Sequence, residues 1–464
     1  MLEKDVIEDV LYVALSRGGD FAEIFVEDRS NKTIEMLAGR VEKSISGRDY
    51  GVGIRIFDGL NSIYAYSNDS SKGNLIELAK SAAAALDGKQ VEKKINFIRR
   101  KIEKNNNPIE IRLTDVAMKE KVDLLKRGHE AAKAYDATIS QVTARYLEEE
   151  QKILIANTDG LLAEDERIRT RYAIQSVASQ DGEMQVGFFA PGKSMGFEFY
   201  DEIDVKEVAR EASRIAVTSL NADYAPSGQM PVIIHKDFGG VLFHEACGHA
   251  LEAESVSRDT SAFAGKEGKK VASSLVTAID DGTIPNAWGT TNIDDEGTPT
   301  RKNILIEDGI LKSYLVDRLN GKRMDKETTG SSRRQSYKYP PTSRMNNTYI
   351  APGESKLEDM IAGTEYGLFA KKLGGGSVNP ATGDFNFAVM EAYIVEDGKI
   401  GRPVRGATLI GNGIEVLEKI DMVGDNLGLG QGMCGASSGS LAVNVGQPSI
   451  RVSSLTVGGR KKED

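Results

Sequence analysis

The chain of 464 residues lacks the features of several protein classes. It has two cysteines, Cys247 and Cys434, too few for a disulfide framework, and this scarcity suits a reducing cytoplasm. Acidic residues outnumber basic ones by 69 to 59, so the net charge of −10 argues against a nucleic-acid or acidic-membrane binder. No stretch approaches the roughly 18 apolar residues of a membrane span, and residues 1–6 carry acids where a secretory signal has basic residues. We therefore expect a cytoplasmic globular protein that binds neither nucleic acid nor membrane.

Histidine is also scarce, yet two of the four histidines in the chain stand close together. His244 and His249 flank a carboxylate, Glu245, in the string His-Glu-Ala-Cys-Gly-His. Neutral imidazoles bind metal ions, and a carboxylate beside them can accept a proton from metal-bound water. This segment is therefore the first candidate for catalytic chemistry.

The spacing of the two histidines imposes a structural requirement. In a regular α-helix, at about 100° per residue, His244 and His249 would point roughly 140° apart, too far for one ion. A π-type turn, which closes residue i to i+5, would bring them together, and Gly248 is a residue that can accept the distortion. The metal hypothesis therefore predicts a π-turn within the helix that we expect over residues 239–253.

Two interpretations of this segment compete. Glu245, His249 and Glu252 have helical spacing and could form a solvated stripe of local ion pairs. Apolar neighbours on both sides, Val241 to Phe243 and Ala250 to Leu251, argue against a free surface. Glu252 is also placed to accept a hydrogen bond from the second ring nitrogen of His249, as the partner of a metal-binding histidine does.

A third metal ligand is not decided by spacing alone. Cys247 lies three residues after His244, and Cys434 lies in a glycine-rich segment that could approach an ion closely. Each could equally be a small buried residue, the usual place of a lone cysteine. A soft thiolate with two imidazoles would favour zinc over magnesium or calcium.

The N-terminal part, residues 1–222, is predicted to be an α+β region with strands paired as hairpins. A charged, apolar-poor linker at 89–112 marks a possible sub-boundary. Periodicity predicts helices over 2–15, 74–86, 115–134 and 204–219, and strands over 21–26, 33–37, 51–57, 62–66, 138–146, 151–156, 168–178 and 184–190. The order of elements repeats after the linker. A distant duplication would explain this, but a common α+β layout is the preferred interpretation because the two parts share no evident sequence identity.

The C-terminal part, residues 223–464, is predicted to be a mainly antiparallel, β-rich domain that carries the metal-binding helix. Glycine-containing turn signals between apolar runs indicate hairpins at 280–282, 307–309 and 396–398. Residues 443–457 supply the last strands. The fold class expected for the whole chain is therefore α+β.

Several segments resemble the TldD/PmbA family of zinc metallopeptidases. The matching segments are His244 to Glu252, Met433 to Gly435, Val445 to Pro448, Ser454 to Gly459, Gly51 to Gly53 and Arg344 to Thr348. They lie in both halves of the chain, which makes the resemblance more specific than one motif. PmbA-type members lack the histidine segment, so this chain resembles the metal-bearing, TldD-type branch.

The resemblance implies a site and a partner. His244, His249 and Cys434 would hold one Zn²⁺ per chain, and Glu245 would be the general base on zinc-bound water. The active form would pair this chain with a PmbA-like chain in a heterodimer that admits unfolded peptides, although a homodimer is conceivable. Cys247 stands where a small or aliphatic residue is expected, which leaves a second thiol near the metal.

Two other functions stay open. The chain could be a regulatory or chaperone-like peptide-binding protein whose metal is structural. It could also be a zinc hydrolase of esters or small amides, since the same site would serve. Arg344, Asn346 and Asn347 are possible substrate contacts, but a structural turn explains them equally well.

Overall fold

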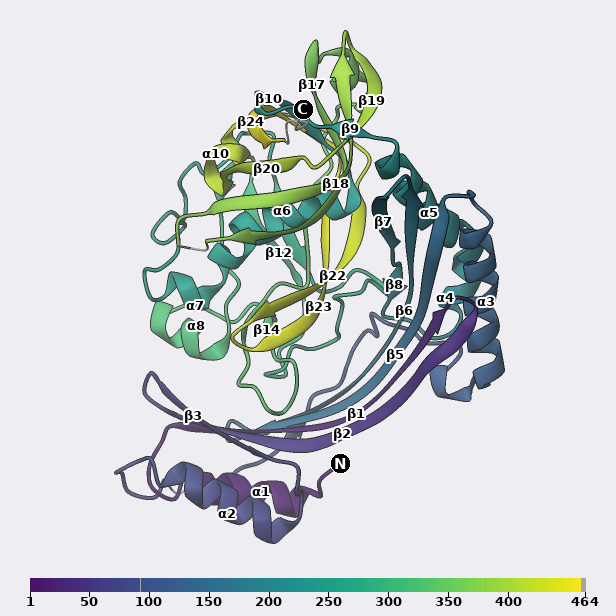
Figure 1. The fold of residues 1–464 in the computed structure, drawn as a ribbon. Coiled ribbons are helices and arrows are strands. Elements are labelled where there is room, and N and C mark those ends of the chain that lie inside the picture. The colour runs from purple at the N-terminus through teal and green to yellow at the C-terminus, as the bar shows by residue number, and fades with distance from the viewer. Residues whose placement is uncertain (92, 380, 460–464) are drawn as a thin grey trace.

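The computed structural model describes residues 1–91, 93–379 and 381–459 and has the predicted α+β architecture (Figure 1). A long curved sheet built by the N-terminal half lies along one side of a β-rich C-terminal half (Figure 1). Among the described residues, no helix is long and apolar enough to cross a membrane.

The N-terminal sheet is built around four long antiparallel strands, in the order β2 (Arg40–Asp58), β1 (Phe21–Leu37), β5 (Ile139–Asn157) and β6 (Leu161–Gln180). Its shorter strands are β3 (Asn61–Ser67), β4 (Ile98–Arg99), β7 (Glu183–Phe189) and β8 (Gly192–Lys193). Its convex face is covered at one end by α1 (Lys4–Ala14) and α2 (Lys72–Ala83), and at the other by α3 (Met118–Lys133) and α5 (Val205–Leu220) (Figure 1). The short helices η1 (Leu113–Asp115) and α4 (Phe199–Glu202) complete this part.

The repeated order of elements is confirmed. A helix, three strands and a helix occur as α1-β1-β2-β3-α2 and again as α3-β5-β6-β7-α5, and the two units meet where β1 pairs with β5. The strands are longer than predicted: the segments 21–26 and 33–37 are one strand, and so are 138–146 and 151–156. Alternate residues of the intervening polar segment face the C-terminal half: Glu27 is fully buried and accepts from the backbone N–H of Tyr337.

Two local predictions need adjustment. Helix α2 begins at Lys72, two residues before the predicted start, and the Asn74 side chain donates to Ser67 Oγ and to the Asp69 carbonyl. The described residues of the predicted linker at 89–112 contain only the strand β4, but the linker is anchored, since Asn106 and Asn107 bond to carbonyls of the C-terminal half.

The C-terminal half has two larger sheets in which antiparallel pairing predominates. One has the order β17-β10-β24-β20-β18-β19-β9, with β21 beside β24, and contains β9 (Asp223–Tyr224), β10 (Gly228–Ile234), β17 (Tyr366–Val378), β18 (Asp384–Glu396), β19 (Lys399–Arg405), β20 (Thr408–Asn412), β21 (Ile420–Val423) and β24 (Ile450–Gly458). The other has the order β13-β12-β11-β16-β23-β22 and contains β11 (Ala278–Asp281), β12 (Lys302–Glu307), β13 (Ile310–Leu311), β16 (Asn347–Ile350), β22 (Gly428–Ala436) and β23 (Gly439–Gln447). Short elements around them are η2 (Asp237–Gly240), β14 (Ser332–Arg333), β15 (Thr342–Ser343), α8 (Arg318–Met324), α9 (Leu357–Ala362) and α10 (Gly413–Glu418).

The predicted hairpins are only partly correct. Turns at 307–309 and 396–398 join β12 to β13 and β18 to β19, as expected. The hairpin predicted at 280–282 is wrong, because β11 pairs with β12 only after a long loop over residues 282–301. This loop leaves the sheet and contacts the N-terminal sheet.

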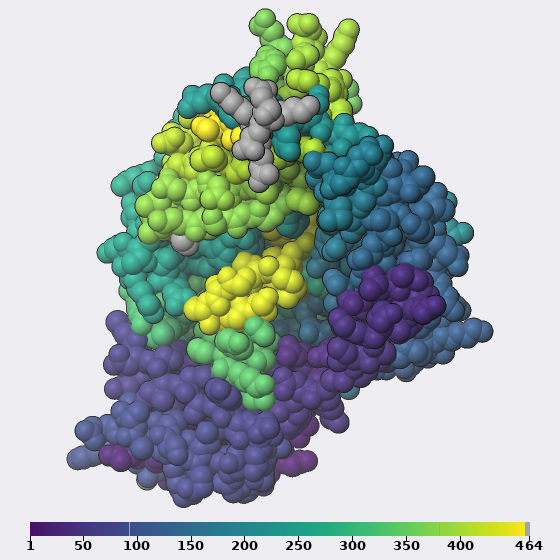
Figure 2. Space-filling model, viewed as in Figure 1, coloured from purple at the N-terminus to yellow at the C-terminus, as the bar shows by residue number. Residues whose placement is uncertain are grey.

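Figure 2 shows β22 and β23, in yellow, at the surface between the purple and blue N-terminal residues and the rest of the C-terminal half.

A buried ion-pair network joins the two halves. Arg55 on β2 lies 3.2 Å from Glu23 on β1 and 2.5 Å from Glu296 in the 282–301 loop. Arg334 lies 2.8 Å from the other oxygen of Glu23. Because burial removes these groups from water, each charge depends on its partners. The network therefore fixes the concave face of the N-terminal sheet against the C-terminal half.

We expect Arg55→Met to reduce the free energy of unfolding by about 3–5 kcal/mol, because it leaves the buried Glu296 carboxylate without its cation. Urea denaturation followed by tryptophan fluorescence measures this. Arg48→Met is the matched control on the same strand: its pair with Asp28 is exposed, the Arg48 side chain being 70% accessible, and its loss should leave the urea midpoint almost unchanged. Equal losses in the two variants would show that the network does not hold the halves together.

Candidate metal centre

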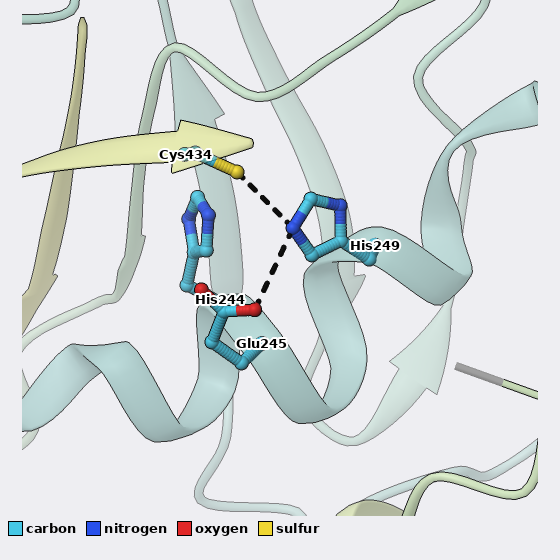
Figure 3. Close-up of side chains that lie close together, drawn as sticks. All are labelled: His244, Glu245, His249 and Cys434. Carbon is cyan, nitrogen blue, oxygen red and sulfur yellow. Dashed lines mark hydrogen bonds and ion pairs between the residues drawn. The ribbon is translucent and has the colours of Figure 1, made fainter. Parts of the chain in front are cut away.

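The helix that carries the two histidines changes its winding at the motif. α6 (Val241–Phe243) continues into a π-helical turn, η3 (His244–Gly248), then into a 3₁₀ turn, η4 (His249–Leu251), and α7 (Ala253–Val256) follows. The predicted π-turn is therefore present. It brings the two imidazole rings to a centroid separation of 5.3 Å, nearly perpendicular at 82° (Figure 3).

Gly248 is required for a reason other than backbone freedom. Its φ of −58° is open to any residue. A Cβ at this position, however, would lie 2.2 Å from Met345 Sδ, far inside contact distance. The glycine thus lets β16 and its preceding residues pack directly against the π-turn.

Cys434 reaches the two histidines from β22, almost two hundred residues further along the chain. Its Sγ lies 3.1 Å from His249 Nε2, and a Glu245 carboxylate oxygen lies 3.6 Å from the same nitrogen (Figure 3). Candidate ligand atoms of His244, Glu245, His249 and Cys434 all lie within 4.8 Å of one another. The structure thus brings together the four residues singled out in the sequence.

The environment of His244 fits a metal ligand. The side chain is fully buried, and neither ring nitrogen has a hydrogen-bond partner among the described residues. A buried polar atom without a partner is unfavourable. Burial, followed by the charges of His249 and of two nearby arginines, holds the pKa of His244 well below its usual value, so the ring is neutral, the form that binds metals. The unpartnered nitrogens, beside a thiol and a second imidazole, suit a soft divalent ion.

Glu252 fixes the orientation of His249, as predicted. One of its carboxylate oxygens lies 3.1 Å from His249 Nδ1. This bond places the proton on Nδ1 and leaves Nε2, the atom nearest Cys434, available as a ligand. Without a metal ion, burial disfavours the charged ring, but Glu252 and Cys434 together hold the pKa of His249 well above its usual value, so a metal that binds Nε2 must displace a proton from it.

Arg344 connects the thiol to this carboxylate, a role that the sequence did not reveal. The side chain is 1% exposed, and its Nη2 donates to the Cys434 carbonyl at 2.7 Å and to Sγ at 3.2 Å. Its Nε lies 3.6 Å from Glu252. Asn346 and Asn347 are also buried and bond to Asp280 and the Asp281 carbonyl, so contacts inside the protein account for these amides.

Cys247 lies on the π-turn but outside this four-residue cluster. Its side chain is completely buried, and its Sγ lies against Gly413 at the start of α10. Burial raises the pKa of the Cys247 thiol, which keeps it protonated. The second thiol is therefore part of the apolar core.

Glu245 occupies the open side of the cluster. Its side chain is 31% exposed, and Figure 3 shows its carboxylate directed toward His249. Partial burial of the Glu245 carboxyl group raises its pKa above the usual value. A more basic carboxylate at an accessible position is suited to accept a proton.

Family models for PmbA/TldA metallopeptidases match most of the chain. The model for domain 1 matches residues 22–86, the central domain 111–220 and the C-terminal domain 227–459. The last of these contains all four residues of the cluster.

Individual proteins agree with this match. A "Metalloprotease TldD homolog" of Buchnera aphidicola is 38% identical, with 95% of this chain and 93% of the relative covered. The Haemophilus influenzae protein of the same name is 37% identical over 99% and 97%. A "Zinc metalloprotease TldD homolog" of Saccharolobus solfataricus is 31% identical over 57% of this chain and 59% of its own length.

Solved structures share the fold. A crystal structure from Thermotoga maritima has a TM-score of 0.81 and 22% identity, over 98% of this chain and 100% of that one. The crystal structure of TldE from Thermococcus kodakarensis has a TM-score of 0.78 and 21% identity, over 98% and 100%.

We expect Arg344→Lys to lower zinc affinity by about 10- to 100-fold, because lysine cannot reach the thiol and Glu252 together. Competition with a chromophoric chelator measures the affinity, and circular dichroism checks that the variant is folded. Arg258→Lys is the control, since among the described residues Arg258, just after α7, is paired with Glu254 alone, and this pair is exposed. Unchanged affinity in Arg344→Lys would mean that Arg344 does not position the ligands.

Proposed function

This chain belongs to the PmbA/TldD family of metallopeptidases, and we propose that it is a zinc-dependent peptidase acting on unfolded or flexible peptides. The observation that carries this proposal is that His249 and Cys434 converge on His244, whose ring nitrogens have no hydrogen-bond partner among the described residues. Glu245 stands beside them on the accessible side.

Three protein ligands are typical of a catalytic zinc site, which keeps one position open. Here His244, His249 and Cys434 would hold the ion. Zinc supplies a Lewis acid that lowers the pKa of a water molecule and polarises the scissile carbonyl. Glu252 and Arg344 hold two of the three ligands in place through the bonds described above.

Glu245 is the proposed general base. Its raised pKa and its position near the ligands let it take the proton from the attacking water. The same carboxyl group then returns the proton to the nitrogen of the leaving amine. Such proton transfer by one positioned group contributes about 10²- to 10⁴-fold to a rate.

The strand that carries Cys434 is suited to bind a peptide substrate in an extended conformation. β22 is the last strand of its sheet and pairs only with β23 among the described strands. On it, Met433 is 55% exposed and Gly435 is exposed as well. A peptide that added to this strand would be bound mainly through its backbone, which tolerates many sequences but requires an unfolded chain.

The proposed assembly is a heterodimer with a PmbA-like chain, with a homodimer as the other form. The similarity to TldE is one of fold, and two chains of one fold often form a two-fold symmetric or pseudo-symmetric pair. Two free cysteines suit a reducing cytoplasm as the site of action.

One observation favours a second candidate function. A Glu245 oxygen lies close enough to the other three residues to be a fourth ligand. A closed four-ligand site would be structural, as in a chaperone-like peptide-binding protein.

A hydrolase of esters or small amides would use the open site in the same way as a peptidase, and substrate profiling separates these two.

The test is Glu245→Gln. We expect this variant to keep one zinc per chain and to lose about 10²- to 10⁴-fold in kcat on unfolded peptides, because the amide cannot accept the proton. Elemental analysis and mass spectrometry of peptide products, with a PmbA-like chain added, provide the two readouts. Glu254→Gln is the control: Glu254 is a nearby carboxylate that binds Ser437. Loss of zinc from Glu245→Gln would instead support the closed structural site.

A further inference from the structure

A cavity of about 280 Å³ lies between the concave face of the N-terminal sheet and the β22–β23 ribbon. Strands β1, β5 and β6 line it on one side, and Met433, Leu441 and Ala442 line it on the other. Met433 directly precedes Cys434. The cavity is therefore adjacent along β22 to the proposed metal site, yet no residue of that site lines it.

Arginines are the most numerous charged residues in the lining. Five arginines contribute to it: Arg29, Arg167, Arg169, Arg333 and Arg334. Its three carboxylates already have cationic partners, Glu148 with Lys121 at 2.6 Å, Asp295 with Arg167 at 2.8 Å, and Glu149 with both Arg169 at 3.3 Å and Arg29 at 3.8 Å. Four of the five arginines also pair with carboxylates: Arg29 with Glu27, Arg167 with Asp165, Arg169 with Glu149 and Arg334 with Glu23. Among the described residues, Arg333 is the lining arginine without a carboxylate at ion-pair distance.

Arg333 differs from the other four arginines in its partners. The residue is 4% exposed, and its terminal nitrogens donate to the carbonyls of Met345 and Ala442. Within the described parts of the chain, no carboxylate lies at ion-pair distance from it, although a buried charge is costly without a counter-ion. Burial, followed by the charge of Arg169, lowers the pKa of Arg333 to about 9, and guanidinium groups remain charged in proteins.

We propose that this cavity binds a carboxylate of the peptide substrate and so places the scissile bond relative to Cys434. The inference rests on the proposed peptidase function and defines its substrate class further. A carboxylate has the planar, two-oxygen shape that guanidinium groups bind in pairs. The volume fits one side chain or one chain end. The net charge of the protein, −10, offers no general attraction for anionic peptides, so a preference would come from this site.

The carboxylate could be the C-terminal end of the peptide or an Asp or Glu side chain. Two pairs of acetylated alanine-rich hexapeptides separate these sources. In one pair the terminus is a free acid or an amide. In the other, both termini are blocked and one internal residue is Glu or Gln. Isothermal titration with the zinc-loaded Glu245→Gln protein measures affinity without turnover.

We expect the acid to bind about tenfold or more tightly than its neutral counterpart in one of the two pairs, since a charged hydrogen bond contributes about 1.5–3 kcal/mol. The pair that shows the preference identifies the source. Equal affinities within both pairs would overturn the inference. This comparison uses the unaltered cavity, so it does not depend on whether an arginine variant folds.

Substitutions of the lining arginines then test which residues produce the preference for the acidic peptide. Arg333→Lys should remove most of it, because lysine keeps the charge but loses the planar pair of donors. Arg169→Gln should do the same if Arg333→Lys does not fold. Arg171→Gln is the matched control: Arg171 lies two residues further along β6, has no carboxylate at ion-pair distance in the described chain, and does not line the cavity. A preference that survives in both Arg333→Lys and Arg169→Gln would contradict the assignment.

Failure of this inference is distinct from failure of the proposed function. If the wild type, with its partner chain, cleaves acid and neutral peptides at equal kcat/KM and binds them equally, the peptidase function stands and the carboxylate site is wrong. If the acid is preferred in binding but no peptide is cleaved, the carboxylate site stands and the peptidase function is wrong.

Discussion

A regular α-helix would hold the rings of His244 and His249 roughly 140° apart. The π-turn over His244–Gly248 brings them within 5.3 Å, and the metal centre depends on this local change of winding. Gly248 has no side chain to meet Met345, so the residues before β16 can pack against the turn. Cys247, on the same turn, is buried in the core and lies outside the cluster, so the proposed third ligand, Cys434, comes from elsewhere in the chain.

Cys434 lies on β22, the outer strand of its sheet. β22 pairs with β23, β23 pairs with β16, and the residues just before β16 include Arg344 and Met345, which contact Cys434 and the π-turn. One connected set of contacts therefore holds the thiol, the histidine helix and the Glu252 carboxylate. The same strand places Met433 in the arginine-lined cavity, so the metal centre and the proposed carboxylate site share a support.

Local features of the site could be predicted from the sequence, and long-range ones could not. The π-turn follows from a five-residue spacing, and the bond from His249 to Glu252 follows from one helical turn. The choice of Cys434 over Cys247 depends on strand pairing nearly two hundred residues away. Arg344 looked like a substrate contact or a turn residue because nothing in its neighbours reveals burial. The hairpin predicted at 280–282 is wrong because the contacts of the 282–301 loop with the N-terminal sheet leave no local sequence pattern.

X-ray absorption spectroscopy of the zinc-loaded protein tests the central claim most directly, because it reports the atoms around the ion. The account predicts one sulfur at about 2.3 Å, from Cys434, and two imidazole nitrogens at about 2.0–2.1 Å, with a light atom in the remaining position. The sulfur should disappear in Cys434→Ala and remain in Cys247→Ala. A shell without sulfur, or one that loses its sulfur in Cys247→Ala, would contradict the ligand set on which the proposed function depends.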